Sequence, residues 1–129
     1  ITMGENLFEK GNYRKAFKVF DDVLKTAEEN SLQEFVSDVY VYRAKCNLRL
    51  NQKNDACKDL EKAIQFNIPE AFILAQENCP SLFTLEMETK LNSNLGSTYF
   101  WNKEYEKAIL YFKGLIEIRI VQVIQFILF

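Results

Sequence analysis

The sequence predicts an all-α fold, an α-solenoid of antiparallel helix pairs. The 129 residues include only 4 glycines and 2 prolines, and this scarcity of turn-forming residues favours helices over strands. Hydrophobic residues make up 48% and charged residues 26%, the balance of a globular protein that buries a core. Two small residues 12 positions apart recur three times, a spacing that lets two helices joined by a short turn approach closely. These pairs are Gly4/Ala16, Ala44/Ala56 and Gly96/Ala108.

Local signals place the individual helices in chain order. Ser31 and Glu34 form a capping-box pattern, which predicts that a helix begins at 32. Pro69 suits the first turn of a short inserted helix, and Pro80 ends it. The expected helices lie near 1–10, 13–29, 32–50, 53–66, 69–78, 82–101 and 104–126.

The residues around the three small-residue pairs resemble the tetratricopeptide repeat. That family has Leu-Gly-x-x-Tyr followed by Ala-x-x-x-Phe in a unit of about 34 residues. The third copy matches at all five positions, Leu95, Gly96, Tyr99, Ala108 and Phe112. The early tryptophan of the family is absent from every copy. The resemblance therefore rests on the small residues where the two helices meet and on the larger residues beside them.

The other two copies are more degenerate and the spacing between copies is irregular. Leu7 and Asn47 stand where the third copy has tyrosine, and the second alanines are 40 and 52 residues apart (56 minus 16 and 108 minus 56). The resemblance implies a single domain over 1–129. Its parts are repeats at about 1–30, 37–66 and 89–118, an inserted short helix at 69–78 and an apolar C-terminal extension at 119–129.

The composition argues against several classes of function. The chain has no histidine, which removes the usual general base near neutral pH and the Ser-His and Cys-His nucleophile arrangements. We therefore expect no catalytic residue, no metal site and no cofactor. A net charge of -2 disfavours nucleic acid as a partner. No stretch has the roughly 20 apolar residues that span a bilayer.

The three cysteines, Cys46, Cys57 and Cys79, show no CxxC spacing. An odd number without that spacing is typical of free thiols in a reducing compartment. We expect three small buried side chains and a cytoplasmic location.

In the family, the first helix of each repeat lines a concave groove. A surface of mixed charge that includes aromatic residues suits an extended or helical peptide. The alternative is that these positions are simply solvated or partly packed. Trp101 would either anchor a partner or fill the gap between repeats. By position, the groove residues are Glu5, Phe8, Glu9, Tyr42, Lys45, Arg49, Asn94, Ser97 and Trp101.

One subclass of the family binds the C-terminal carboxylate of a chaperone peptide with lysine, asparagine and arginine side chains. The matching positions in this chain hold no such cation. The resemblance therefore implies that this clamp is absent. Those positions are Ile1, Glu5, Tyr42, Ser93 and Ser97.

The C-terminal tail is strongly apolar, since Gln122 and Gln125 are the polar residues among its last ten. As the continuation of a helix it needs cover from a following repeat, a second copy of the chain or a partner protein. Its β-branched residues also permit a strand. The residues predicted to mediate self-association are Ile120, Val123, Ile124 and Ile127.

Together these features predict a non-catalytic protein-interaction module or scaffold. It would bind a protein or peptide in the groove and self-associate through the C-terminal helix. The alternative is a sensory or regulatory domain of a larger signalling or transcription-regulatory protein.

Overall fold

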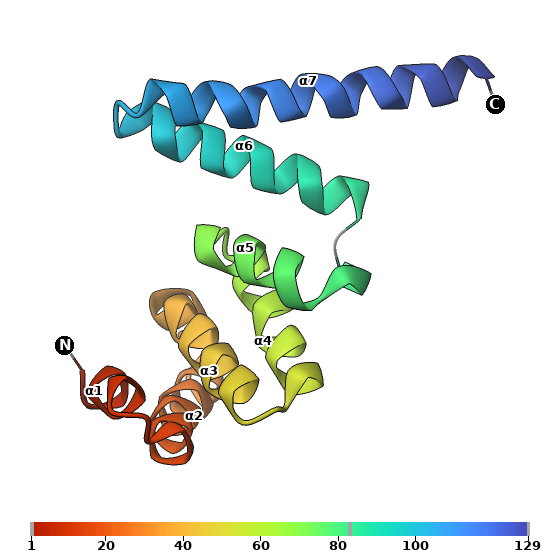
Figure 1. The fold of residues 1–129 in the computed structure, drawn as a ribbon. Helices are drawn as coiled ribbons and strands as arrows, with labels where there is room; N and C mark the ends of the chain where they lie inside the picture. The colour runs from red at the N-terminus through yellow and green to blue at the C-terminus, as the bar shows by residue number, and fades with distance from the viewer. Residues whose placement is uncertain (1, 83, 129) are drawn as a thin grey trace. The chain divides into compact units, whose positions relative to one another are not determined.

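The computed structural model describes residues 2–82 and 84–128, all of whose regular structure is helical (Figure 1). No strand occurs in these ranges, so the predicted all-α fold is confirmed, and the strand considered for the tail is wrong because its residues continue α7. The elements are α1 (Met3–Glu9), α2 (Tyr13–Glu29), η1 (Gln33–Val36), α3 (Ser37–Arg49), α4 (Lys53–Gln65), α5 (Pro69–Asn78), η2 (Pro80–Leu82), α6 (Leu85–Trp101) and α7 (Tyr105–Leu128).

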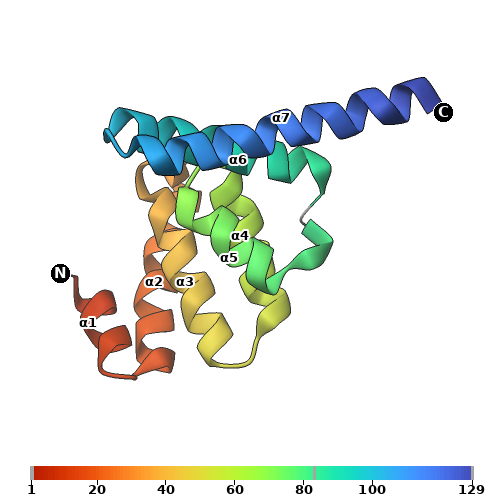
Figure 2. The ribbon, with the colours of Figure 1, turned by 45° about the horizontal axis from the view of Figure 1, so that its top comes forward.

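The chain divides into two compact units, Ile1–Leu82 and Phe83–Phe129, here called the N-terminal unit and the C-terminal unit. In the N-terminal unit each of the helices α1 to α5 packs against the next along the chain, as Figure 2 shows. In the C-terminal unit α6 packs along α7. The single domain expected over 1–129 stays a prediction, and each unit is described by itself.

The small-residue pairs bring the helices of each pair together, as predicted. Ala16, Ala44 and Ala56 are fully buried. A Cβ atom added to Gly4 would lie 2.6 Å from the ring of Phe20. One added to Gly96 would lie 2.6 Å from the ring of Phe112. Any larger side chain at the two glycines would displace an aromatic ring of the partner helix.

Five helices end in the same way, with one residue in the left-handed conformation. After α1, for example, the Asn12 N–H donates to the Leu7 carbonyl and the Gly11 N–H donates to the Phe8 carbonyl. This pattern satisfies carbonyls that a helix end leaves free and reverses the chain within a few residues. The left-handed residues are Gly11, Ser31, Asn51, Asn67 and Lys103.

The capping box predicted at Ser31 and Glu34 is wrong. Ser31 has φ +55° and terminates α2, because its N–H donates to the Glu28 carbonyl. A residue that caps the start of a helix needs extended backbone angles instead. The next residues form η1, and α3 begins at Ser37 rather than at 32.

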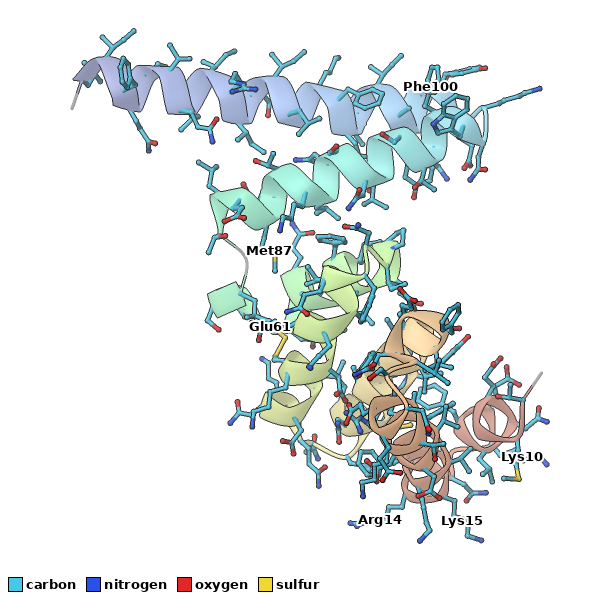
Figure 3. All side chains as sticks on the ribbon, turned by 180° about the vertical axis from the view of Figure 1, so that it is seen from behind. Lys10, Arg14, Lys15, Glu61, Met87 and Phe100 are labelled. Atoms are coloured by element: carbon cyan, nitrogen blue, oxygen red, sulfur yellow. A yellow bond between two sulfur atoms is a disulfide. The ribbon has the colours of Figure 1, made fainter. Side chains whose placement is uncertain are left out.

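Two of the three cysteines are paired, which corrects the prediction of three free thiols. Cys57 on α4 and Cys79, the residue that follows α5, form a disulfide, drawn as a yellow bond in Figure 3. Their separation of 22 residues carries no sequence signal. The packing of α4 against α5 brings their Cα atoms within 5.8 Å. Cys46 remains a free, buried thiol, as predicted.

Candidate peptide-binding surface

The nine predicted groove residues fall into two sets that belong to different units. Six lie in the N-terminal unit, on α1 and α3, which are the first helices of two repeats. The other three lie on α6 of the C-terminal unit, so each set is considered separately. The first set is Glu5, Phe8 and Glu9 on α1 with Tyr42, Lys45 and Arg49 on α3, and the second is Asn94, Ser97 and Trp101.

Packing holds the two aromatic residues of the first set in place. Phe8 and Tyr42 are half-buried against a core cluster that includes Phe20 and Cys46. The rings of Tyr42 and Phe20 are stacked, with centroids 5.3 Å apart and planes at 15°. Burial raises the pKa of the Cys46 thiol to about 11, so this thiol beneath the surface stays protonated at neutral pH. Tyr42 therefore presents a ring whose position is fixed by its neighbours.

Charged groups from three helices gather around Tyr42. The Lys45 ammonium lies 5.6 Å from the centroid of the Tyr42 ring and forms an ion pair with Glu70 of α5. Burial raises the pKa of the Tyr42 hydroxyl, and the negative charges of Glu5, Asp38 and Glu70 raise it further. Asp38 precedes Tyr42 by one helical turn, which places both on one face of α3.

We call Glu5, Asp38, Tyr42, Lys45 and Glu70 the Tyr42 surface. Its three carboxylates outnumber its single lysine, and the carboxylates come from α1, α3 and α5. The surface thus combines a fixed aromatic ring with an excess of negative charge, which are the two features that attract a cation.

Arg49 belongs to a neighbouring group rather than to this surface. Its guanidinium lies 5.6 Å from the centroid of the Tyr13 ring. Tyr13 in turn meets Phe8 edge to face, with centroids 5.1 Å apart. Glu9 is exposed beside them. The structure therefore brings five of the six residues into two adjoining aromatic and charged groups, and leaves Glu9 at their margin.

On α6, Trp101 is 78% exposed and touches Phe100 edge to face at 5.5 Å between centroids. Within the C-terminal unit, the indole of Trp101 is therefore mostly open to solvent. Ser97 is also exposed, whereas Asn94 is half-buried.

The four residues predicted to mediate self-association, Ile120, Val123, Ile124 and Ile127, are all exposed on α7. Helix α7 extends beyond the start of α6, which leaves its last turns without a neighbour inside this unit (Figure 1). In the described part of the chain no helix is both long enough and apolar enough to cross a bilayer.

Sequence reasoning missed Asp38 and Glu70, because it considered positions matched to the repeat pattern and Glu70 lies on the inserted helix. It also missed an open apolar depression of about 630 Å³ on the surface at the end of α2, although Leu32 and Phe35 are apolar residues in a connecting segment. The depression is lined by Asp22, Val23, Thr26, Ala27, Leu32, Phe35 and Val36.

The comparison with known families agrees with this geometry. Family models described as tetratricopeptide repeat match residues 38–66, which cover α3 and α4, and residues 89–119, which cover much of α6 and α7. No curated protein matches the chain significantly. Repeats of this kind generally mediate protein-protein interaction and form a non-catalytic fold. Two matched helix pairs in an all-helical structure support a tetratricopeptide repeat protein.

Proposed function

We propose that the chain is a non-catalytic interaction module that binds an extended or helical peptide on the first helices of its repeats. In the N-terminal unit the peptide would contact the Tyr42 surface through a lysine or arginine. The observation that carries this proposal is the Tyr42 ring held in place by Phe20, on whose hydroxyl the negative charges of Glu5, Asp38 and Glu70 act. A ligand cation would take the place of the Lys45 ammonium over the ring and gain a cation-π contact, and the carboxylates would add charge-assisted hydrogen bonds.

The position of Lys45 supports this choice of partner. Its ammonium sits over the Tyr42 ring and is paired with Glu70, so the surface accommodates a cation of the kind a ligand would supply. Glu5 and Asp38 form no ion pair among the described residues, and their charges are available to a ligand. An acidic peptide or a C-terminal carboxylate would meet the wrong charge at these positions.

A random peptide library sorted on the immobilised full chain tests the proposal. We expect the bound peptides to be enriched in lysine and arginine, and their affinity to fall about tenfold or more when Tyr42→Ala removes the ring. Because Tyr42→Ala also alters packing, the double variant Glu5→Gln/Asp38→Asn provides a second test that keeps the core intact. Glu29→Gln, an exposed change at the end of α2, is the control. Enrichment of acidic peptides, or unchanged binding by both variants, would refute the assignment.

In the C-terminal unit, the exposed Trp101, with Asn94 and Ser97 on the same helix, forms a second proposed contact for a partner. Self-association through the last turns of α7 is proposed as well, because the exposed Ile120 and Ile127 need an apolar cover. Sedimentation of the full chain should show concentration-dependent association that Ile120→Lys/Ile127→Lys removes. A chain that sediments as a monomer at every concentration would contradict this part.

The disulfide changes the proposed location. The cytoplasmic prediction relied on free thiols, whereas structural disulfides persist mainly in oxidising compartments. We therefore propose that the N-terminal unit resides in such a compartment. Trapping of free thiols in intact cells tests this directly. Modification of Cys46 alone after denaturation supports the proposal, and modification of all three cysteines without reductant contradicts it.

A further inference from the structure

Helix α7 carries an apolar stripe along its whole length, not only in its last turns. The side chains of this stripe follow one another in steps of three or four residues, which keeps them on one face of a helix. Phe112 is half-buried, and the others are exposed, from 49% at Val123 to 73% at Ile127. We call this face the α7 stripe, and its members are Tyr105, Ile109, Phe112, Ile116, Ile120, Val123 and Ile127.

Helix α6 covers a different face of α7 (Figure 1). The buried residues of α7 are Ala108 and Ile118. At about 100° per residue, the middle of the α7 stripe is turned by about 120° from the middle of these two. The described part of the C-terminal unit has no third helix that could cover the stripe. A continuous apolar face about 33 Å long, at 1.5 Å per residue, is rare on a monomeric protein and marks an interaction site.

The polar residues of the tail lie off the stripe. Gln122 and Gln125 are both exposed, and their positions on the helix point away from the stripe by at least a third of a turn. A partner that covers the stripe therefore buries no side-chain amide of α7. Because the face is apolar throughout, its occupant must present an apolar face of similar length.

The spacing of the α7 stripe is the same in both directions from Ile116. The other members lie in pairs at 4, 7 and 11 residues from it, namely Phe112 and Ile120, Ile109 and Val123, and Tyr105 and Ile127. When two identical helices pack antiparallel about a two-fold axis at Ile116, each stripe residue meets a stripe residue of the second copy. A second copy of α7 is thus complementary to the face in both length and spacing.

The charges beside the stripe favour the antiparallel orientation over the parallel one. Lys113 and Glu117 lie on one flank of the stripe, and neither forms an ion pair among the described residues. In an antiparallel pair the same flank of both helices comes together, so Lys113 of each copy lies near the partner's Glu117. In a parallel pair this flank meets the opposite one, where Arg119 is the charged residue and Lys113 finds no anion. Only the antiparallel pair therefore matches both charges.

We propose that the α7 stripe is the interface of a homodimer in which two copies of α7 pack antiparallel, with Ile116 at the two-fold axis. This inference rests on the self-association proposed above and extends it from the last turns to the whole helix. Tyr105 and Ile109, near the start of α7, then meet the end of the partner's helix. The exposed apolar residues at both ends of α7 are covered by the same contact.

Cross-linking of cysteine variants of the full chain with a short bis-maleimide tests the orientation and the register. Ile116→Cys should yield a covalent dimer, because the two thiols meet at the axis. Ile109→Cys and Val123→Cys should cross-link with each other when mixed. Neither should cross-link with itself, since its two copies lie about 21 Å apart along the helix. The native cysteines do not interfere, because two are paired and Cys46 is buried.

The outcomes separate this inference from the proposed self-association. A chain that sediments as a monomer at every concentration refutes both. A chain that associates, but in which Val123→Cys cross-links with itself, self-associates in the parallel orientation and refutes the antiparallel pair alone. A monomer that co-sediments with phosphatidylcholine vesicles would assign the stripe to a lipid surface and also overturns the inference.

Charge variants provide a second test in solution. Lys113→Glu should weaken dimerisation at least tenfold, because it places two carboxylates together at both ends of the charge contact. The double variant Lys113→Glu/Glu117→Lys should restore the affinity to within about threefold, since it exchanges the two charges. Glu106→Lys is the matched control, an exposed charge reversal on α7 that faces no charged residue in the antiparallel pair. Equal weakening in the control, or no recovery in the double variant, would refute the pairing.

Discussion

The N-terminal and C-terminal units use the same contact between two helices but bury it to different extents. Gly4 receives the Phe20 ring in the first, and Gly96 receives the Phe112 ring in the second. Phe20 is only 4% exposed, whereas Phe112 is half-buried. Helix α2 has α1 on one side and α3 on the other, but α7 packs along α6 alone within its unit. A helix pair of this kind therefore needs a further helix before its second member is fully covered.

The N-terminal unit is also held together by specific bonds for which the C-terminal unit shows no counterpart among the described residues. The Cys57–Cys79 disulfide joins α4 to the end of α5. Arg43 joins α2, α3 and α4 through Asp21 and Asp59. We therefore expect equivalent substitutions to lower the free energy of unfolding more in the N-terminal unit than in the C-terminal unit. The following predictions test this from the largest effect to the smallest.

Truncation of the two equivalent phenylalanines should separate the units most clearly. Phe20→Ala is expected to lower the free energy of unfolding by about 3–5 kcal/mol, because it leaves a cavity in a closed core. Phe112→Ala should lower the free energy of unfolding by about half as much, because part of the Phe112 ring is already exposed to water. Urea unfolding combined with hydrogen exchange assigns each loss to its unit. Phe35→Ala, at a 74% exposed site, is the control. Equal losses at positions 20 and 112 would contradict the comparison.

Removal of the disulfide should destabilise the N-terminal unit alone. Cys57→Ser is expected to lower the free energy of unfolding by about 3 kcal/mol. The disulfide joins residues 22 positions apart, and the loop that it closes restricts the unfolded chain. Cys79→Ser must give the same loss, since either change breaks the same bond. Wild-type protein unfolded in urea with a reducing agent should match both variants. A transition midpoint that does not respond to reductant would show that the bond is absent.

Addition of a single methyl group probes the close approach of the helices. Gly4→Ala should destabilise by about 1–3 kcal/mol, since Phe20 has little room to move. Gly96→Ala should cost less, because Phe112 can shift toward solvent and alanine favours the helix by about 1 kcal/mol. Gly114→Ala, whose added atom would meet the flexible Asn92 side chain, is the control. Thermal melts monitored by circular dichroism measure all three. A Gly4→Ala variant as stable as wild type would argue against the tight contact.

The smallest effect concerns a thiol rather than stability. Because the pKa of Cys46 is raised to about 11, its reactive thiolate is scarce below that pH, and burial blocks reagents. Native protein should therefore resist alkylation from pH 7 to pH 9. Unfolded protein should incorporate one label without reductant and three with it. Rapid labelling of the native protein at pH 8 would contradict this assignment.

Much of the fold could be predicted from local spacing. The expected ranges 13–29 and 69–78 coincide with α2 and α5, because turn residues and prolines mark their ends. The start of α3 was missed, since Ser31 reads as a cap in the sequence but adopts the left-handed conformation that ends α2.

The candidate site was predictable only in part. Tyr42, Lys45 and Glu5 follow from their repeat positions, and in the structure Lys45 lies over the Tyr42 ring and the charge of Glu5 acts on the Tyr42 hydroxyl. Glu70 could not be found in this way, because it reaches the Tyr42 surface from a helix that the repeat pattern does not include. Its role depends on how α5 packs beside α3.

The sequence by itself determined the helices and the pairs of small residues that let them meet. This information is local, since side chains three, four or seven positions apart share one face of a helix whatever surrounds it. The tertiary structure decided which cysteines pair and which carboxylates surround Tyr42. These contacts join helices far apart along the chain, and the packing of one helix against the next sets their distances.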